Sequence, residues 1–132
     1  MPIKIVIDKD KNRTTHISTG NITFAEALSA SRKFFSGGQA TRDLVLDMRQ
    51  ASMDLITSKE IEQLTEFYNN RVNQRPENPR TALVVADTVN YGLSRIVQST
   101  AQLDRSPTRL EIFSSAEDAE AWLDSPPDPA PA

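Results

Sequence analysis

Two hydroxyl side chains, Thr57 and Ser58, have the type and placement to support chemistry. They stand at the predicted start of a helix, where a phosphoryl group would add negative charge beside free backbone amides and the positive end of the helix dipole. The same residues have a structural explanation, because the spacing of Thr57 and Glu60 is that of a capping box. Both hydroxyls are therefore candidate phosphorylation sites, with helix capping as the alternative interpretation.

Two carboxylates, Asp47 and Asp87, lie at the ends of apolar segments that are predicted to be central strands. Ligands of open α/β sheets bind at the carboxyl edge of the strands, and two acids there could hold a hard cation such as magnesium. However, Asp87 can also cap the next helix. A receiver-type phosphoacceptor site would also use a lysine, and the chain has none after Lys59. The sequence therefore predicts no metal site.

Further polar residues near this predicted edge could contact a ligand or a protein partner. Arg95 could pair with an anionic ligand or with an acid of a partner. Scattered arginines such as Arg42 and Arg49 are more often surface salt-bridge partners, and Gly92 after Tyr91 could serve helix packing. The candidate binding residues are Arg49, Asp54, Asp87, Asn90, Tyr91 and Arg95.

The composition excludes several classes of site. The 132 residues contain no cysteine and one histidine, so disulfides, thiolate nucleophiles, Cys-type zinc sites and two-imidazole sites are impossible. We expect His16 to be exposed on an edge strand, without the nucleophile and acid of a catalytic dyad. With no catalytic constellation visible, the sequence predicts a protein that is not an enzyme and needs no cofactor. The net charge of −3 gives no reason to expect nucleic acid as a partner.

No segment of the sequence predicts export or a membrane span. The start, MPIKIVID, is too short and too charged for the apolar part of a signal peptide. No apolar stretch approaches the ~18–20 residues that a bilayer span requires. We therefore expect a cytoplasmic protein without stable membrane insertion.

The spacing of apolar residues predicts strands that alternate with helices. Segments 3–8 and 13–19 alternate as a hairpin does, whereas 44–48 and 81–86 are apolar on both faces, as central strands are. The predicted order is β-β-α-β-α-β-α-β-α, with a last strand at 109–113 and helices that begin near Thr23, Thr57, Asp87 and Ser114. This order predicts an α/β fold with a mixed, mostly parallel sheet of about five strands and flanking helices.

The whole chain fits one domain over residues 1–124, followed by a flexible proline-rich tail over 125–132. Trp122 and Leu123 are expected to seal the last helix onto the sheet. Phe35 and Phe67 have two interpretations: they belong to the core, or they form the surface of a homodimer.

Four segments carry a resemblance to a known family: 80–87 (RTALVVAD), 91–95 (YGLSR), 110–113 (LEIF) and 116–123 (AEDAEAWL). They form a hydrophobic strand, a helix start with an aromatic-Gly-Leu-x-Arg pattern, a strand that ends in Phe, and an acidic helix that ends in Trp-Leu. This pattern resembles the SpoIIAA-like (STAS/SEC14-type) family of small bacterial proteins. The order of the elements matches the STAS fold of anti-sigma-factor antagonists.

The resemblance implies a non-catalytic regulatory or protein-binding module. Anti-sigma-factor antagonists carry a phosphorylatable serine in an Asp-Ser-Ser-Gly-like stretch at the start of the helix after the third strand. Segment 53–59 (MDLITSK) occupies that place here, where Asp54 precedes Thr57 and Ser58 and the glycine is missing. The alternative, suggested by SEC14-type relatives, is a carrier that binds a lipid or another small apolar ligand between the helices and the sheet.

Overall fold

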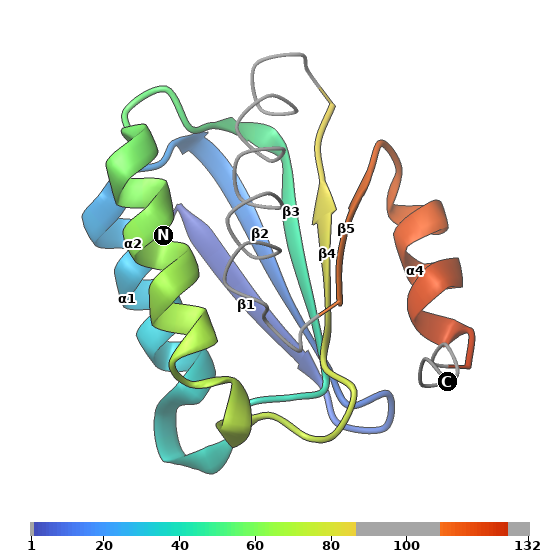
Figure 1. The fold of residues 1–132 in the computed structure, drawn as a ribbon. Helices are drawn as coiled ribbons and strands as arrows, with labels where there is room; N and C mark the ends of the chain where they lie inside the picture. The colour runs from blue at the N-terminus through green and yellow to red at the C-terminus, as the bar shows by residue number, and fades with distance from the viewer. Residues whose placement is uncertain (1, 87–108, 127–132) are drawn as a thin grey trace.

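A computed structural model of the chain describes residues 2–86 and 109–126. The helix predicted after Asp87 and most of the predicted tail lie outside these ranges. The elements along the described residues are β1 (Ile3–Asp8), β2 (Arg13–Asn21), α1 (Phe24–Phe35), the 3-10 turn η1 (Ser36–Gly38), β3 (Asp43–Ser52), α2 (Ser58–Asn69), the 3-10 turn η2 (Val72–Gln74), β4 (Arg80–Val84), β5 (Arg109–Phe113) and α4 (Ala116–Asp124) (Figure 1).

The five strands form one mixed sheet in the order β1-β2-β3-β4-β5 (Figure 1). β1 and β2 pair antiparallel, and the other three neighbouring pairs are parallel. Leu44 of β3 is aligned with Thr81 of β4, and Asp47 with Val84. The two apolar runs therefore lie side by side and point the same way, and the α/β fold with a mostly parallel sheet is confirmed.

β3 is longer than the sequence predicted. It runs to Ser52, four residues beyond the apolar segment 44–48 that was expected to form the strand. A register shift between Ile17 and Thr19 of β2 allows residues 50–52 to pair with residues 19–21. The hydrogen bonds of a strand pair come from the backbone, so the ladder continues after the apolar side chains end.

Helices cover both faces of the sheet (Figure 1). α4 packs on one face, where Val45, Ala82 and Val84 of the strands meet Ala119 and Leu123 of the helix. α1 and α2 lie together on the other face, which holds two clusters of buried apolar side chains. One cluster contains Phe34, Phe35, Ala40 and Leu44, and the other contains Ile22, Met48, Ile56, Ile61 and Val85.

Helices α1 and α2 both begin with a capping box, as the sequence predicted for Thr57 and Glu60. The hydroxyl of Thr23 accepts a bond from the backbone N–H of Glu26, whose carboxylate accepts from the N–H of Thr23 at 2.9 Å. Thr57 and Glu60 make the same reciprocal pair at the start of α2. After α1 the chain turns at Gly37, whose φ of 63° lies in the left-handed region that glycine adopts at low cost. The helix boundaries thus follow from local sequence.

The expectation that His16 is exposed on an edge strand is wrong. β2 lies between β1 and β3, and His16 is 2% exposed. Thr14 and Ser18 occupy alternate positions of the same strand and are also buried. The parallel pairing with β3 makes β2 an interior strand, and this pairing could not be deduced from the hairpin alone.

Of Phe35 and Phe67, which the sequence left with two interpretations, Phe35 belongs to the core. The Phe35 ring is buried, with its centroid 4.9 Å from that of Phe34 and 5.5 Å from that of Tyr68. Leu123 is buried, and Trp122 packs beside Phe113 with 5.5 Å between the ring centroids. The last helix is sealed onto the sheet as the sequence predicted.

Candidate functional site

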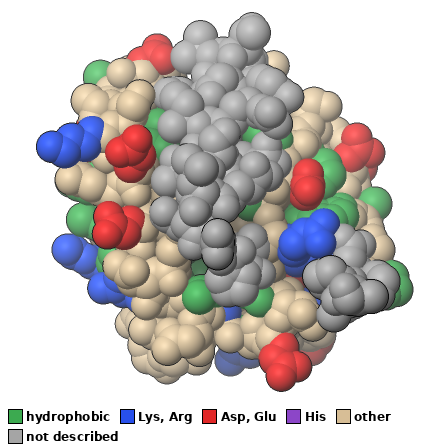
Figure 2. Space-filling model, in the orientation of Figure 1, with side chains coloured by type: hydrophobic (Ala, Val, Ile, Leu, Met, Phe, Trp, Pro, Cys, Tyr) green, Lys and Arg blue, Asp and Glu red, His purple; other side chains and the backbone are tan. Residues whose placement is uncertain are grey.

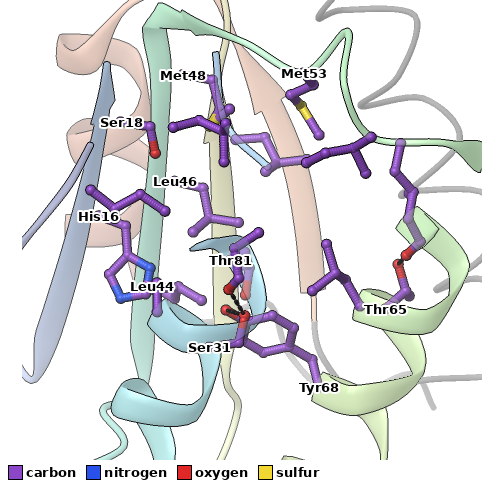
Figure 3. Close-up of a pocket in the computed structure, with 18 of the residues that line it drawn as sticks. His16, Ser18, Ser31, Leu44, Leu46, Met48, Met53, Thr65, Tyr68 and Thr81 are labelled. Carbon is purple, nitrogen blue, oxygen red and sulfur yellow. Dashed lines mark hydrogen bonds between the residues drawn. The ribbon is translucent and has the colours of Figure 1, made fainter. Parts of the chain in front are cut away.

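A cavity of about 140 Å³ lies between the sheet and the helix pair α1 and α2. Figure 3 shows side chains of the strands and of both helices converging on this space. The strand side chains come from alternate positions, which all face the same side of a sheet. They are Ile3 of β1, His16 and Ser18 of β2, Leu44, Leu46 and Met48 of β3, Thr81 and Leu83 of β4, and Leu110 of β5.

Small residues of α1 help to leave this space open. Ala27, Ala30 and Ser31 have the i, i+3, i+4 spacing of one helix face, and all three line the cavity. Protein interiors are normally packed as closely as organic crystals. A helix face with such short side chains cannot fill the distance to the sheet, so a void remains.

One end of the cavity is apolar. Met48 and Met53 lie together at this end in Figure 3, and Ile22, Ile56 and Ile61 line the same cavity. These residues belong to one cluster of apolar side chains. The described side chains at this end offer an occupant no charge and few hydrogen bonds.

The other end is polar. Figure 3 places Ser31, Tyr68 and Thr81 there, beside His16 and Leu44. The Ser31 hydroxyl donates to the Ala27 carbonyl at 2.8 Å, and its oxygen lies 2.9 Å from that of the Tyr68 hydroxyl. Burial raises the pKa of Tyr68 above its ordinary value, partly offset by the bond to Ser31. Tyr68 is therefore a neutral hydrogen-bonding group at neutral pH.

Arg75 brings a buried positive charge to this lining. Its guanidinium donates to the carbonyls of Thr41, Arg42 and Arg80 and to the hydroxyl of Thr81. Burial lowers its pKa to about 10, so the side chain is still charged at pH 7. Among the described residues, no carboxylate lies within 4.0 Å of this guanidinium. The dipoles of these three carbonyls and of the Thr81 hydroxyl stabilise the charge of Arg75.

His16 is the second unusual group of the lining. Burial lowers the pKa of its imidazole to about 4, so the ring is neutral at pH 7. Its Nε2 atom is buried without a hydrogen-bond partner among the residues that the structure describes. A buried polar atom without a partner costs about 1–3 kcal/mol.

Thr57 and Ser58 lie outside the cavity lining, on the exposed start of α2. Thr57 acts as the N-cap, and Ser58 is the first residue of the helix. Asp54 is exposed in the preceding turn, and its backbone N–H is bonded to the Ser52 hydroxyl.

Arg49 forms an ion pair with Asp47, with Nη2 2.8 Å from Oδ2. The hydrogen bonds from Arg49 lower the pKa of Asp47 below its ordinary value. Asp47 lies within β3 rather than at its end, and neither residue lines the cavity.

The other candidate binding residues, Asp87, Asn90, Tyr91 and Arg95, lie outside the described residues. Within the described ranges, no group of three or more His, Asp or Glu side chains could hold a metal ion.

Sequence reasoning did not place His16 or Arg75 in a cavity lining, where the structure has both. His16 alternates with Thr14 and Ser18 along the sequence, so the three side chains share one face of a strand. They are buried because that strand lies inside the sheet. Arg75 carried no signal of its burial in the sequence, because it stands in the segment that ends α2 and reads as an ordinary loop residue. Its role depends on carbonyls from two other segments of the chain.

The surface carries mixed charge. Figure 2 shows acidic and basic side chains interspersed on one face of the molecule, and no histidine is visible there. Among the described residues the large apolar side chains with substantial exposure are Val6, Ile7 and Leu55. None of the described helices is long and apolar enough to cross a membrane.

The fold is similar to that of a solved structure. It is an uncharacterised protein of the DUF3478 family with a SpoIIAA-like fold from Shewanella loihica, with a TM-score of 0.57 and 15% identity over 92% of this chain and 91% of that chain. No family model matches the sequence, and no curated protein matches it. The resemblance predicted from segments 80–123 is confirmed at the level of the fold: the chain has a SpoIIAA-like fold.

Proposed function

We propose that this protein is a non-catalytic binding module that takes up a small, largely apolar molecule between its sheet and the helices α1 and α2. The observation that supports this function is the cavity of about 140 Å³, whose lining is mostly Ile, Leu, Met and Ala. Interiors rarely keep voids much larger than a water molecule. A space of this size and character is suited to a ligand.

The volume limits the size of the occupant. An apolar cavity of about 150 Å³ stays dry and binds benzene. The cavity of about 140 Å³ therefore suits a molecule of that class, or the apolar end of a longer one. This proposal develops the carrier alternative that the SEC14-type resemblance suggests.

Native mass spectrometry of the protein purified from cells tests the proposal directly. We expect a fraction of the protein to retain a small molecule that denaturing conditions release. Ala30→Leu would fill the cavity from α1 and should abolish this retention. Ala25→Leu is the matched control, because Ala25 is exposed on the same helix. Equal retention by both variants would place the molecule elsewhere and contradict the proposal.

A second candidate function is regulated binding of a protein partner through residues 54–58. Leu55 is 57% exposed, beside the exposed hydroxyls of Thr57 and Ser58. An exposed apolar side chain next to a modifiable helix start suits a switchable contact. Capture of a partner from host lysate should then fall with Leu55→Ser and with Ser58→Glu, and should persist with Ala30→Leu. Capture that is unchanged by the first two variants would rule out this surface.

A further inference from the structure

The cavity lining holds a buried charge, the Arg75 guanidinium, that forms no ion pair with the residues the structure describes. Arg75 is 7% exposed, yet the described residues offer its guanidinium only carbonyls and one hydroxyl. Tyr68 and then Asp43 contribute favourable charge interactions to Arg75, but the oxygens of Asp43 are bonded by Arg13 and Arg42. A buried cation is stable when an anion or strong acceptors surround it. An anion in the cavity would complete this environment.

The guanidinium still has donor capacity. An arginine carries five N–H groups, and the four bonds to the backbone and to Thr81 leave one Nη1 hydrogen for a further acceptor. His16 adds a second donor when Nε2 carries the proton, since a neutral imidazole has one N–H, on either nitrogen. Two donors match the two oxygens of a carboxylate and fall short of what a phosphate needs.

Both groups line the cavity, and both lie beside the ring of Phe34. The ring of His16 meets the ring of Phe34 edge to face with 6.2 Å between their centroids. The Cζ atom of Arg75 lies 5.3 Å from the same Phe34 centroid. Met48 and Met53 occupy the other end (Figure 3). The cavity therefore has the polarity of an amphipathic molecule, with one polar end and one apolar end.

We propose that the ligand is a small monocarboxylate, with its apolar body at the methionine end and its carboxylate facing Arg75 and His16. This inference rests on the proposed function, because it names the chemical class that the same cavity takes up. A neutral apolar molecule would leave both polar groups uncompensated. A carboxylate relieves the buried cation and the imidazole nitrogen together.

Calorimetric titration of the full chain with three probes of one size tests the inference. Toluene, benzyl alcohol and benzoate differ in polar group and share the aromatic body. We expect benzoate to bind more tightly than benzyl alcohol at neutral pH. His16→Phe and Arg75→Gln should each weaken benzoate at least about tenfold, as the loss of a charge-assisted hydrogen bond does, and should weaken toluene by a smaller factor.

The controls separate this inference from the function beneath it. Arg71 is a matched control, because its guanidinium also lies over an aromatic ring, 3.7 Å from the Phe67 centroid, but does not line the cavity. Arg71→Gln should therefore change neither the affinity for benzoate nor the affinity for toluene. His16→Phe keeps an aromatic ring in place and decides the question if Arg75→Gln does not fold. Toluene binding without benzoate binding would overturn the carboxylate and keep the cavity, and no binding of any probe would overturn both.

Discussion

The buried imidazole of His16 makes the stability of this protein sensitive to mild acid. Its pKa is about 4 in the fold, compared with 6.5 for an unperturbed histidine. Between these values the unfolded chain binds a proton that the folded chain excludes, so the free energy of unfolding falls as the pH drops from about 6.5 to about 4. The loss attributable to His16 should reach about 3 kcal/mol.

Urea denaturation across this pH range measures the effect. The difference in stability between wild type and His16→Phe should shrink or reverse towards pH 4, because the variant has no imidazole to protonate. Tyr68 and Arg75 line the same cavity and keep their protonation state over this range. A difference that stays constant with pH would contradict the burial of a neutral His16.

Arg75 also has a structural role that lysine cannot replace. Its fork holds the carbonyls of Thr41, Arg42 and Arg80 together, and one ammonium group cannot reach all three in the same geometry. Arg75→Lys should lower the free energy of unfolding by at least about 2 kcal/mol, because buried carbonyls lose their donors. Arg71→Lys, which removes one bond to the Phe67 carbonyl, should cost less than about 1 kcal/mol. Equal costs for the two variants would show that the fork is not needed.

At the scale of the elements, the start of α2 depends on its cap. Thr57→Ala should lower the free energy of unfolding by about 1 kcal/mol, because the Glu60 backbone N–H loses its acceptor. Ser58→Ala, one residue later in the first turn, should change it by less than about 0.5 kcal/mol. Chemical denaturation checks both values. A larger cost for Ser58→Ala would mean that Ser58 is the more important hydroxyl.

The elements could be predicted where local chemistry decides them. The capping boxes at Thr23 and Thr57 fixed two helix starts, and the apolar run 81–86 marked a central strand. The extension of β3 to Ser52 could not be predicted in this way. It depends on a register shift in β2, which is a property of the strand pair and leaves no trace in the hydropathy of either segment.

At the scale of the whole molecule, the fold was predictable and the cavity was not. Alternating strands and helices require a mostly parallel sheet, and the SpoIIAA-like fold of the matched structure agrees with that order. The cavity arises only when the short side chains of Ala27, Ala30 and Ser31 face the sheet. Arg75 is held in the cavity lining by bonds to Thr41 and Arg42, which lie 34 and 33 positions earlier in the chain. No local sequence pattern encodes contacts over such a separation.

The fold by itself does not define a function, because one fold supports many sites. What distinguishes this chain is the polarity of its interior, with a methionine-lined end and an end that carries a buried guanidinium and a buried imidazole. The proposed cavity ligand and its proposed carboxylate both follow from that arrangement. They predict that the interior, rather than the mixed-charge surface in Figure 2, is where a small molecule binds.

Titration of toluene into wild type, Ala30→Leu and Ala25→Leu, followed by calorimetry, tests the central claim most directly. We predict one binding site in wild type and in Ala25→Leu, and at least about tenfold weaker binding in Ala30→Leu, whose longer side chain would occupy the space that the ligand needs. Equal affinity of all three proteins, or no binding to wild type, would contradict the assignment of the cavity as a ligand site.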